Sequence, residues 1–177
     1  MKRLVSLSAA IVLLIALAPA GQAAASTTSA SASQNALLLP ALETWWGGGP
    51  ADNFATATVD GTNDARAAGY VYVRTEGFVW DQFASGRTGL YSLYSSARGD
   101  NITTATQAGY DSAINAGYFP VRTEGWVYTS QVSGTVPLYQ YWHGGRADNF
   151  VTATQAGRNA AVAAGYVFVR VEGYVKS

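Results

Sequence analysis

Hydrophobic and polar residues alternate along one stretch of the chain, and this stretch occurs three times, at residues 70–76, 118–124 and 166–172. Successive side chains of a strand point to opposite sides, so alternate residues share a face. One face carries the apolar set Val71, Val73, Thr75, Phe119, Val121, Thr123, Val167, Val169 and Val171. The other face carries Tyr70, Tyr72, Arg74, Glu76 and their counterparts. The alternation predicts three strands whose valine-bearing face packs in the core.

The segments around these strands predict short elements of two kinds. Aromatic-rich segments favour strands, and they lie at residues 42–46, 90–94 and 138–142. Glycine- or serine-rich turns and a second short strand, such as residues 53–58, follow each of them. Alanine-rich segments that end at a glycine predict short helices, at residues 61–68, 109–116 and 157–164. The fold class is therefore mainly β with short helices.

The whole pattern repeats every 48 residues without insertion or deletion. Asp52-Asn53 recurs as Asp100-Asn101 and as Asp148-Asn149, and 100 − 52 = 148 − 100 = 48. The copies span residues 42–89, 90–137 and 138–177. One copy is too small to bury its apolar face alone, so the three copies must share a core. We expect a single domain of three pseudo-symmetric repeats with a β-trefoil-like arrangement; an open stack or a small propeller is the alternative.

The first 25 residues have the layout of a secretory signal peptide. Lys2 and Arg3 precede an apolar run at residues 9–18, and small residues follow it. Residues 26–41 are rich in serine, alanine and threonine, which predicts a disordered linker. We expect a secreted, extracellular protein with no membrane segment after cleavage; an uncleaved anchor is the alternative.

Composition excludes several classes of function. The 11 basic and 11 acidic residues cancel, which argues against a nucleic-acid partner. The chain has no cysteine and one histidine, so we expect no cysteine or multi-histidine metal site and no cofactor. Nucleophile and phosphate-binding motifs are absent from the sequence. Glycoside hydrolysis requires two carboxyl groups with different pKa values, and the repeated acids here have near-identical surroundings. We therefore expect that the protein is not an enzyme.

The three copies resemble a known repeat family. Its units read G-D-x-F-x-T-T, then a helix, then G-Y-x-x-E-G, and the matching segments are residues 99–104, 147–152 and 165–173. The family is an uncharacterised repeat of secreted bacterial and fungal proteins, often appended to extracellular hydrolases. The resemblance implies a trefoil-like fold and a role in carbohydrate binding or attachment. The first copy departs from the pattern, because residues 47–50 replace the usual turn and Ala51 stands in place of Gly99.

The candidate ligand-binding residues are an acid, an amide and an aromatic ring in each copy. They are Asp52, Asn53, Asp100, Asn101, Asp148, Asn149, Trp46, Tyr94 and Trp142. Carboxylate and amide groups can bind vicinal hydroxyls, and an aromatic ring can stack on the C–H surface of a sugar. The alternative interpretation is that Asp and Asn bond to local backbone and shape the turn.

These features favour a non-enzymatic, lectin-like module with up to three equivalent weak sites for a glycan or cell-wall polysaccharide. Rigid linkage of weak sites raises avidity for a repetitive target. The alternative is a secreted trefoil that binds a protein partner, such as a protease inhibitor, through one asymmetric loop. The candidate loops are residues 47–50, 81–88 and 129–137. Arg74 and Glu76 with their counterparts share a strand face, and we interpret them as ion pairs that hold the copies in register, or else as a polar surface with Tyr70, Tyr118 and Tyr166.

Overall fold

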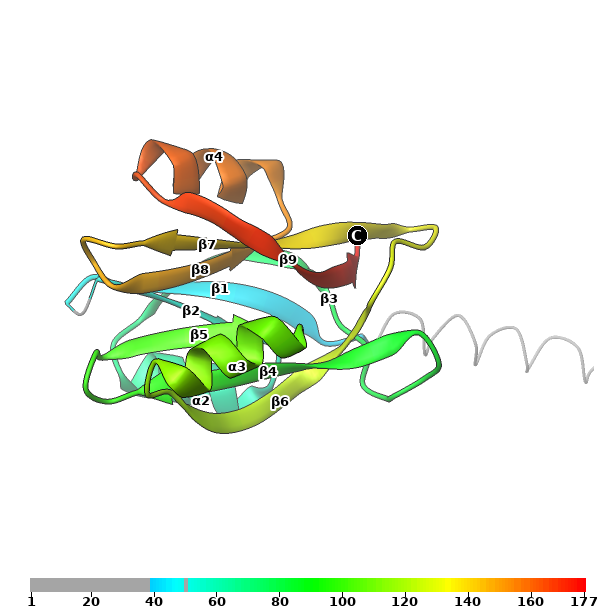
Figure 1. Ribbon diagram of the computed structural model, residues 1–177, viewed down its shortest axis with the longest axis horizontal. Helices are drawn as coiled ribbons and strands as arrows, with labels where there is room; N and C mark the ends of the chain where they lie inside the picture. Colours follow the sequence, from blue (N-terminus) through cyan, green and yellow to red (C-terminus); the bar gives the residue numbers. More distant parts are fainter. Residues whose placement is uncertain (1–38, 50) are drawn as a thin grey trace, which may run out of the picture. The chain divides into compact units, whose positions relative to one another are not determined.

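A computed structural model describes residues 39–49 and 51–177 (Figure 1). The predicted signal peptide, residues 1–25, and the predicted linker up to residue 38 lie outside the described residues. The first strand begins at Ala41, one residue before the predicted boundary. The carbonyl of Pro40 already accepts a hydrogen bond from the backbone of Val79, at 2.9 Å.

Each copy contributes two strands, a helix and a third strand, in that order. The elements of the first copy are β1 (Ala41–Gly47), β2 (Asp52–Thr56), α2 (Val59–Ala67) and β3 (Val71–Phe78). Those of the second are β4 (Arg87–Ser95), β5 (Asp100–Thr104), α3 (Gln107–Asn115) and β6 (Phe119–Tyr128). Those of the third are β7 (Thr135–His143), β8 (Asp148–Thr152), α4 (Gln155–Ala163) and β9 (Val167–Lys176). The prediction of a mainly β fold with short helices is confirmed.

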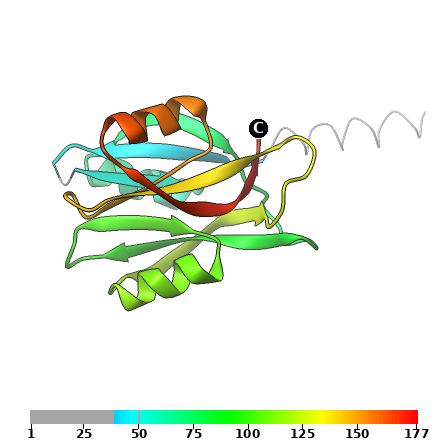
Figure 2. The same ribbon diagram turned by 45° about the horizontal axis from the view of Figure 1, so that its top comes forward.

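All strand pairs are antiparallel, and the first strand of each copy lies between the other two strands of that copy. Thus β1 pairs with β2 and β3, β4 with β5 and β6, and β7 with β8 and β9. The far ends of the third strands join the copies, because Phe78 pairs with Lys176, Tyr128 with Tyr174, and Trp80 forms a bridge with Trp126. Helices α3 and α4 lie on the outer side of the strands (Figure 2).

The central core gathers one leucine and one valine from each copy, all fully buried. They are Leu42, Leu90, Leu138, Val79, Val127 and Val175. The leucines lie on the first strands, and each valine follows the glycine near the end of a third strand. Gly125 has a φ of +148°, and a Cβ there would lie 2.5 Å from Cγ2 of Val79. Glycine is therefore required where the third strands approach one another most closely.

The prediction that the valine-bearing face of the third strand is the core face is wrong. Val71 is 61% exposed, Phe119 72% and Val167 61%. The first half of β3 pairs with β1 alone, and the equivalent parts of β6 and β9 lie at edges in the same way. The buried side of the strand carries Glu76 instead, and the apolar side chains that enter the core come after the glycine.

Buried glutamates of the third strands tie together the copies. Each accepts hydrogen bonds from a Thr-Ala-Thr segment of another copy: Glu124 from residues 56–58 of copy 1, Glu172 from residues 104–106 of copy 2, and Glu76 from residues 152–154 of copy 3. Oε2 of Glu172 accepts from the hydroxyls of Thr104 and Thr106, at 2.7 and 2.9 Å, and from the backbone N–H of Ala105, at 3.0 Å. The glutamates therefore hold the junction between the second strand and the helix.

The same threonines begin the helices. The hydroxyl of Thr106 accepts from the backbone N–H of Gly109, at 3.1 Å, which caps α3, and equivalent threonines cap α2 and α4. The expected Arg–Glu ion pairs are present within each third strand, at 3.4 Å for Arg74 with Glu76, and at 3.9 and 3.2 Å in the other copies. The arginines thus neutralise carboxylates whose main partners lie in a different copy.

We expect Glu172→Gln to lower the free energy of unfolding by about 2–4 kcal/mol, because a neutral amide oxygen accepts the four N–H and O–H donors around Oε2 more weakly than a carboxylate does, and because Arg170 loses its counter-ion. Urea unfolding followed by fluorescence measures this change. The control is Asp81→Asn, an exposed carboxylate, which should change stability by less than about 0.5 kcal/mol. Equal stabilities for the two variants would contradict the role of Glu172.

Candidate functional site

The three candidate aspartates come together in one buried cluster. Asp52, Asp100 and Asp148 are the first residues of β2, β5 and β8, and these three strands contact one another. The side chains are at most 2% exposed, and one oxygen of each carboxylate lies within 4.8 Å of the others. The sequence pattern predicts one acid at each of up to three equivalent ligand sites, whereas the structure brings the three acids together.

Each carboxylate is bound by the asparagine of another copy and by a tyrosine of its own copy. Asp52 accepts from the backbone N–H of Asn101, at 3.2 Å, and from its side-chain amide, at 2.7 Å. The hydroxyl of Tyr70 donates to the same carboxylate, at 2.5 Å. Equivalent contacts join Asp100 to Asn149 and Tyr118, and Asp148 to Asn53 and Tyr166. The asparagines lie in a neighbouring copy and each tyrosine lies 18 residues further along its own copy, so these partners are not the local backbone of the turn.

Crowding and burial change the acidity of this cluster. Burial, followed by the contact with Asp100, raises the pKa of Asp52 to about 8. Burial is also the largest cause that raises the pKa of Asp148 to about 6, and the charge of Asp100 adds to it. Burial and the hydrogen bond to Asp52 raise the pKa of Tyr70 above its ordinary value. The cluster therefore retains protons that free aspartates would release.

Among the described residues, these aspartates are the one set of histidine, cysteine or acidic side chains arranged closely enough to hold a metal ion. Donors of the protein already occupy both oxygens of each carboxylate. These hydrogen bonds account for the cluster as a junction between the copies.

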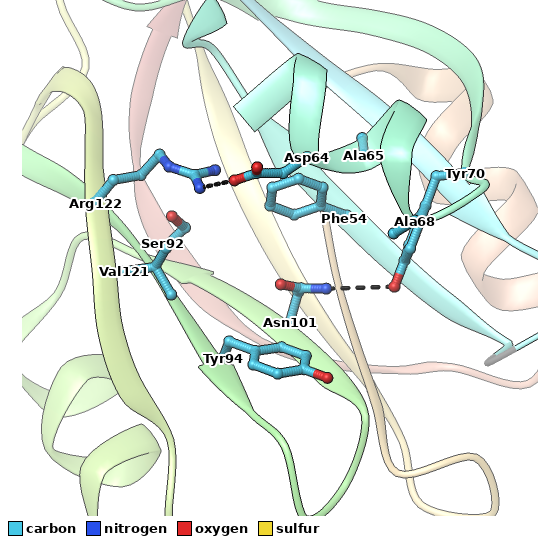
Figure 3. Close-up of a pocket in the computed structure, with 10 residues that line it drawn as sticks. All are labelled: Phe54, Asp64, Ala65, Ala68, Tyr70, Ser92, Tyr94, Asn101, Val121 and Arg122. Atoms are coloured by element: carbon cyan, nitrogen blue, oxygen red, sulfur yellow. Dashed lines mark hydrogen bonds and ion pairs between the residues drawn. The ribbon is translucent and has the colours of Figure 1, made fainter. Parts of the chain in front are cut away.

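Three clefts lie at the boundaries between the copies, next to this junction. Cleft 1 has a volume of about 270 Å³, and its lining residues are Phe54, Asp64, Ala65, Ala68, Tyr70, Ser92, Tyr94, Asn101, Val121 and Arg122 (Figure 3). One wall comes from α2 and its neighbours in copy 1, and the other wall comes from β4, β5 and β6 of copy 2.

The other two clefts use corresponding positions. Cleft 2, also about 270 Å³, has among its lining residues Arg98, Ile102, Ser112, Tyr118, Trp142, Asn149, Val169 and Arg170. Cleft 3, about 170 Å³, has Trp46, Asn53, Val73, Arg74, Arg146, Phe150, Ala160 and Tyr166. The chain thus builds the same kind of recess three times, each between two copies.

Six of the nine candidate residues line these clefts. In each cleft the aromatic residue and the asparagine are direct cross-strand neighbours: Tyr94 with Asn101 in cleft 1, Trp142 with Asn149 in cleft 2, and Trp46 with Asn53 in cleft 3. The aspartates lie behind this wall and hold the asparagines in place. Figure 3 shows the amide nitrogen of Asn101 directed toward the hydroxyl of Tyr70, at 3.4 Å, and its oxygen directed away.

The opposite walls of the clefts carry residues that the sequence pattern does not single out. Helix residues such as Asp64 and the turn residues Arg98 and Arg146 were not among the candidates, although all three line clefts. The recurrence of arginine at positions 98 and 146, which are 48 residues apart, was the available signal. The tyrosines and third-strand arginines, interpreted from the sequence as a possible polar surface, also lie here.

Comparison with known proteins shows the family of this chain. Residues 46–176 match the family described as Domain of unknown function (DUF5648), and the chain belongs to that family. Neither the curated proteins nor the solved structures contain a match. In the part of the chain that the structure describes, no helix is sufficiently long and apolar to span a membrane.

We expect the free energy of unfolding to decrease as the pH rises from about 4 to about 8. The raised pKa of Asp52 means that the folded chain holds a proton that the unfolded chain releases near pH 3.8. Its contribution is fully present below that pH and is lost as the pH passes the folded value. Urea unfolding at pH 5 and at pH 8.5 measures the loss, which we expect to exceed about 1 kcal/mol.

The variant Asp52→Asn isolates this effect, because an amide does not titrate. The variant should lose less stability between the two pH values than the native chain does, whereas Asp81→Asn should follow the native chain. The same pH dependence in Asp52→Asn as in the native chain would contradict the assignment.

Proposed function

We propose that this protein is a secreted, non-enzymatic carbohydrate-binding module with a lectin-like cleft at each of its three copy boundaries. One observation carries the proposal. An aromatic ring and an asparagine amide stand side by side on adjacent strands in all three clefts, as Tyr94 and Asn101 do in cleft 1.

The lining of the clefts suits a small ligand with both apolar and polar faces. Tyr94 is 39% exposed, so its ring is accessible to the C–H face of a sugar. Asn101, Tyr70 and Arg122 place polar groups in the same cleft. Volumes of 170–270 Å³ lie at or below the small end of ligand sites, about 300 Å³, which favours one or two sugar units over a larger ligand.

A closed β-trefoil-like arrangement is part of the proposal. Its support is the cyclic order of the contacts: the asparagine of copy 2 binds the acid of copy 1, that of copy 3 binds copy 2, and that of copy 1 binds copy 3. The glutamate contacts follow a cyclic order as well. Three shallow sites held in one rigid body would bind a repetitive polysaccharide more tightly than any single site.

The acids of the described residues give no support to a glycosidase. Hydrolysis requires two carboxyl groups about 5–10 Å apart on either side of the substrate. Asp64 is the one acid that lines cleft 1, and none lines cleft 2 or cleft 3. The clustered aspartates are buried behind the cleft walls.

The test is a panel of soluble glycans and insoluble polysaccharides, with affinities measured by calorimetry. Tyr94→Ala, Trp142→Ala and Trp46→Ala should each lower avidity, and the triple variant should lower it more than about tenfold, because every cleft then lacks its ring. Phe83→Ala is the matched control, since Phe83 is an exposed aromatic residue outside the clefts, 66% exposed.

Unchanged binding by the triple variant, or no binding to any glycan by the native chain, would overturn the proposal. A protease panel tests the alternative of a protein partner in the same series. Inhibition that depends on one loop, such as residues 81–88, and not on the cleft residues would favour that alternative.

A further inference from the structure

Each of the three clefts contains an arginine from a third strand, and a buried glutamate balances the charge of that arginine. Arg122 lines cleft 1, Arg170 cleft 2 and Arg74 cleft 3. Each lies 3.2–3.9 Å from the glutamate two residues later in its strand, and the glutamate side chains are fully buried. This pair is common to all copies and does not distinguish the clefts.

Cleft 1 carries an additional acid that the other two clefts lack. Asp64 projects from α2 and forms an ion pair with Arg122 across the cleft (Figure 3). The corresponding helix positions are Ser112 in cleft 2 and Ala160 in cleft 3, neither of which is charged. The guanidinium group of Arg122 is therefore already engaged by a carboxylate of the protein.

Clefts 2 and 3 carry an additional arginine that cleft 1 lacks. Arg98 lines cleft 2 with its Cζ 5.7 Å from the ring centre of Tyr118. Arg146 lines cleft 3 with its Cζ 5.8 Å from the ring centres of both Trp46 and Tyr166. Neither arginine forms an ion pair with any acid that the structure describes. The corresponding position of copy 1 in the sequence is Pro50.

The charges of the lining residues therefore differ. Beyond the arginine that its glutamate balances, cleft 1 has one additional acid, whereas clefts 2 and 3 each have one additional arginine. A planar guanidinium group binds a carboxylate through two parallel hydrogen bonds, and such charge-assisted bonds are about twice as strong as neutral ones.

We propose that clefts 2 and 3 bind sugar units that carry a carboxylate, as in a uronic acid polymer, and that cleft 1 binds a neutral unit. The inference rests on the proposed function and adds its ligand class. Arg98 and Arg146 bind the carboxylate at the mouth of their clefts, while the sugar ring packs on Trp142 or Trp46. Asp64 repels an acidic unit from cleft 1 and leaves room for a neutral one.

The probes are a trimer of galacturonic acid and the same trimer fully esterified with methyl groups, titrated into the purified protein by calorimetry. The acid should bind at two sites at least about tenfold more tightly than the ester, and this preference should shrink at high salt because the attraction is screened. Arg98→Gln with Arg146→Gln should abolish the preference, so that the acid and the ester bind with equal affinity. Arg66→Gln is the matched control, because Arg66 is an exposed arginine outside the clefts.

The variant Asp64→Ala tests the other half of the proposal. It removes the repulsion from cleft 1, which should then bind the acidic trimer and the ester about equally, while clefts 2 and 3 keep the preference that Arg98 and Arg146 give them. Melting temperatures of all variants should remain near that of the native chain, since Arg98, Arg146 and Asp64 are exposed at the surface.

The outcomes separate this inference from the proposed function. Equal binding of acid and ester at all three clefts, with the effects of the ring substitutions intact, overturns the charge preference and leaves the proposed function standing. No binding of either trimer, or of any glycan, overturns both. Competition by inorganic phosphate as effective as that of the acidic trimer overturns the sugar assignment, because the arginines would then bind any small anion.

Discussion

The structure depends on one constraint. Carboxylates of one copy are buried among the hydrogen-bond donors of another copy. Asp52, Asp100 and Asp148 meet near one point, and Glu76 and its counterparts each enter the junction of another copy. A buried carboxylate without partners costs several kcal/mol. No copy can satisfy these groups alone, so the three copies fold as one unit.

The clefts are a consequence of that constraint. An asparagine that reaches across the boundary to an acid places its own strand against the helix of the neighbouring copy, and the recess between them becomes a cleft. Tyr70 belongs to both the aspartate junction and cleft 1, because its hydroxyl donates to Asp52 while the residue lines the cleft. The residues that hold the copies together thus lie directly behind the residues that line the clefts. The walls can vary without loss of the junction, as Asp64, Ser112 and Ala160 do at one position.

The exposure of apolar side chains on the third strands shows that hydrophobicity alone does not identify the buried face. Val71 and Val73 alternate with polar residues as core residues do, yet they are exposed at a strand edge, while Glu76 of the same strand is buried. Alternation identifies the two faces of a strand and not which face is covered. The covered face here is the one with a carboxylate, because another copy supplies threonine hydroxyls and backbone N–H groups to it.

Local pattern alone determined the secondary structure and the ring–amide pairs. Turn residues, the glycines that end the helices, and alternation act within a few residues, so the strands, the helices and the adjacency of Trp46 to Asn53 could be predicted. The partners of Asp52 and Glu76, the opposite walls of the clefts and the charge difference between clefts could not. The partners that Asp52 and Glu76 have in other copies lie 49 to 78 residues away in the chain, and only the packing of one copy against another brings them together. The sequence contains the repeated residues, and the packing of one copy against the next decides which of them meet.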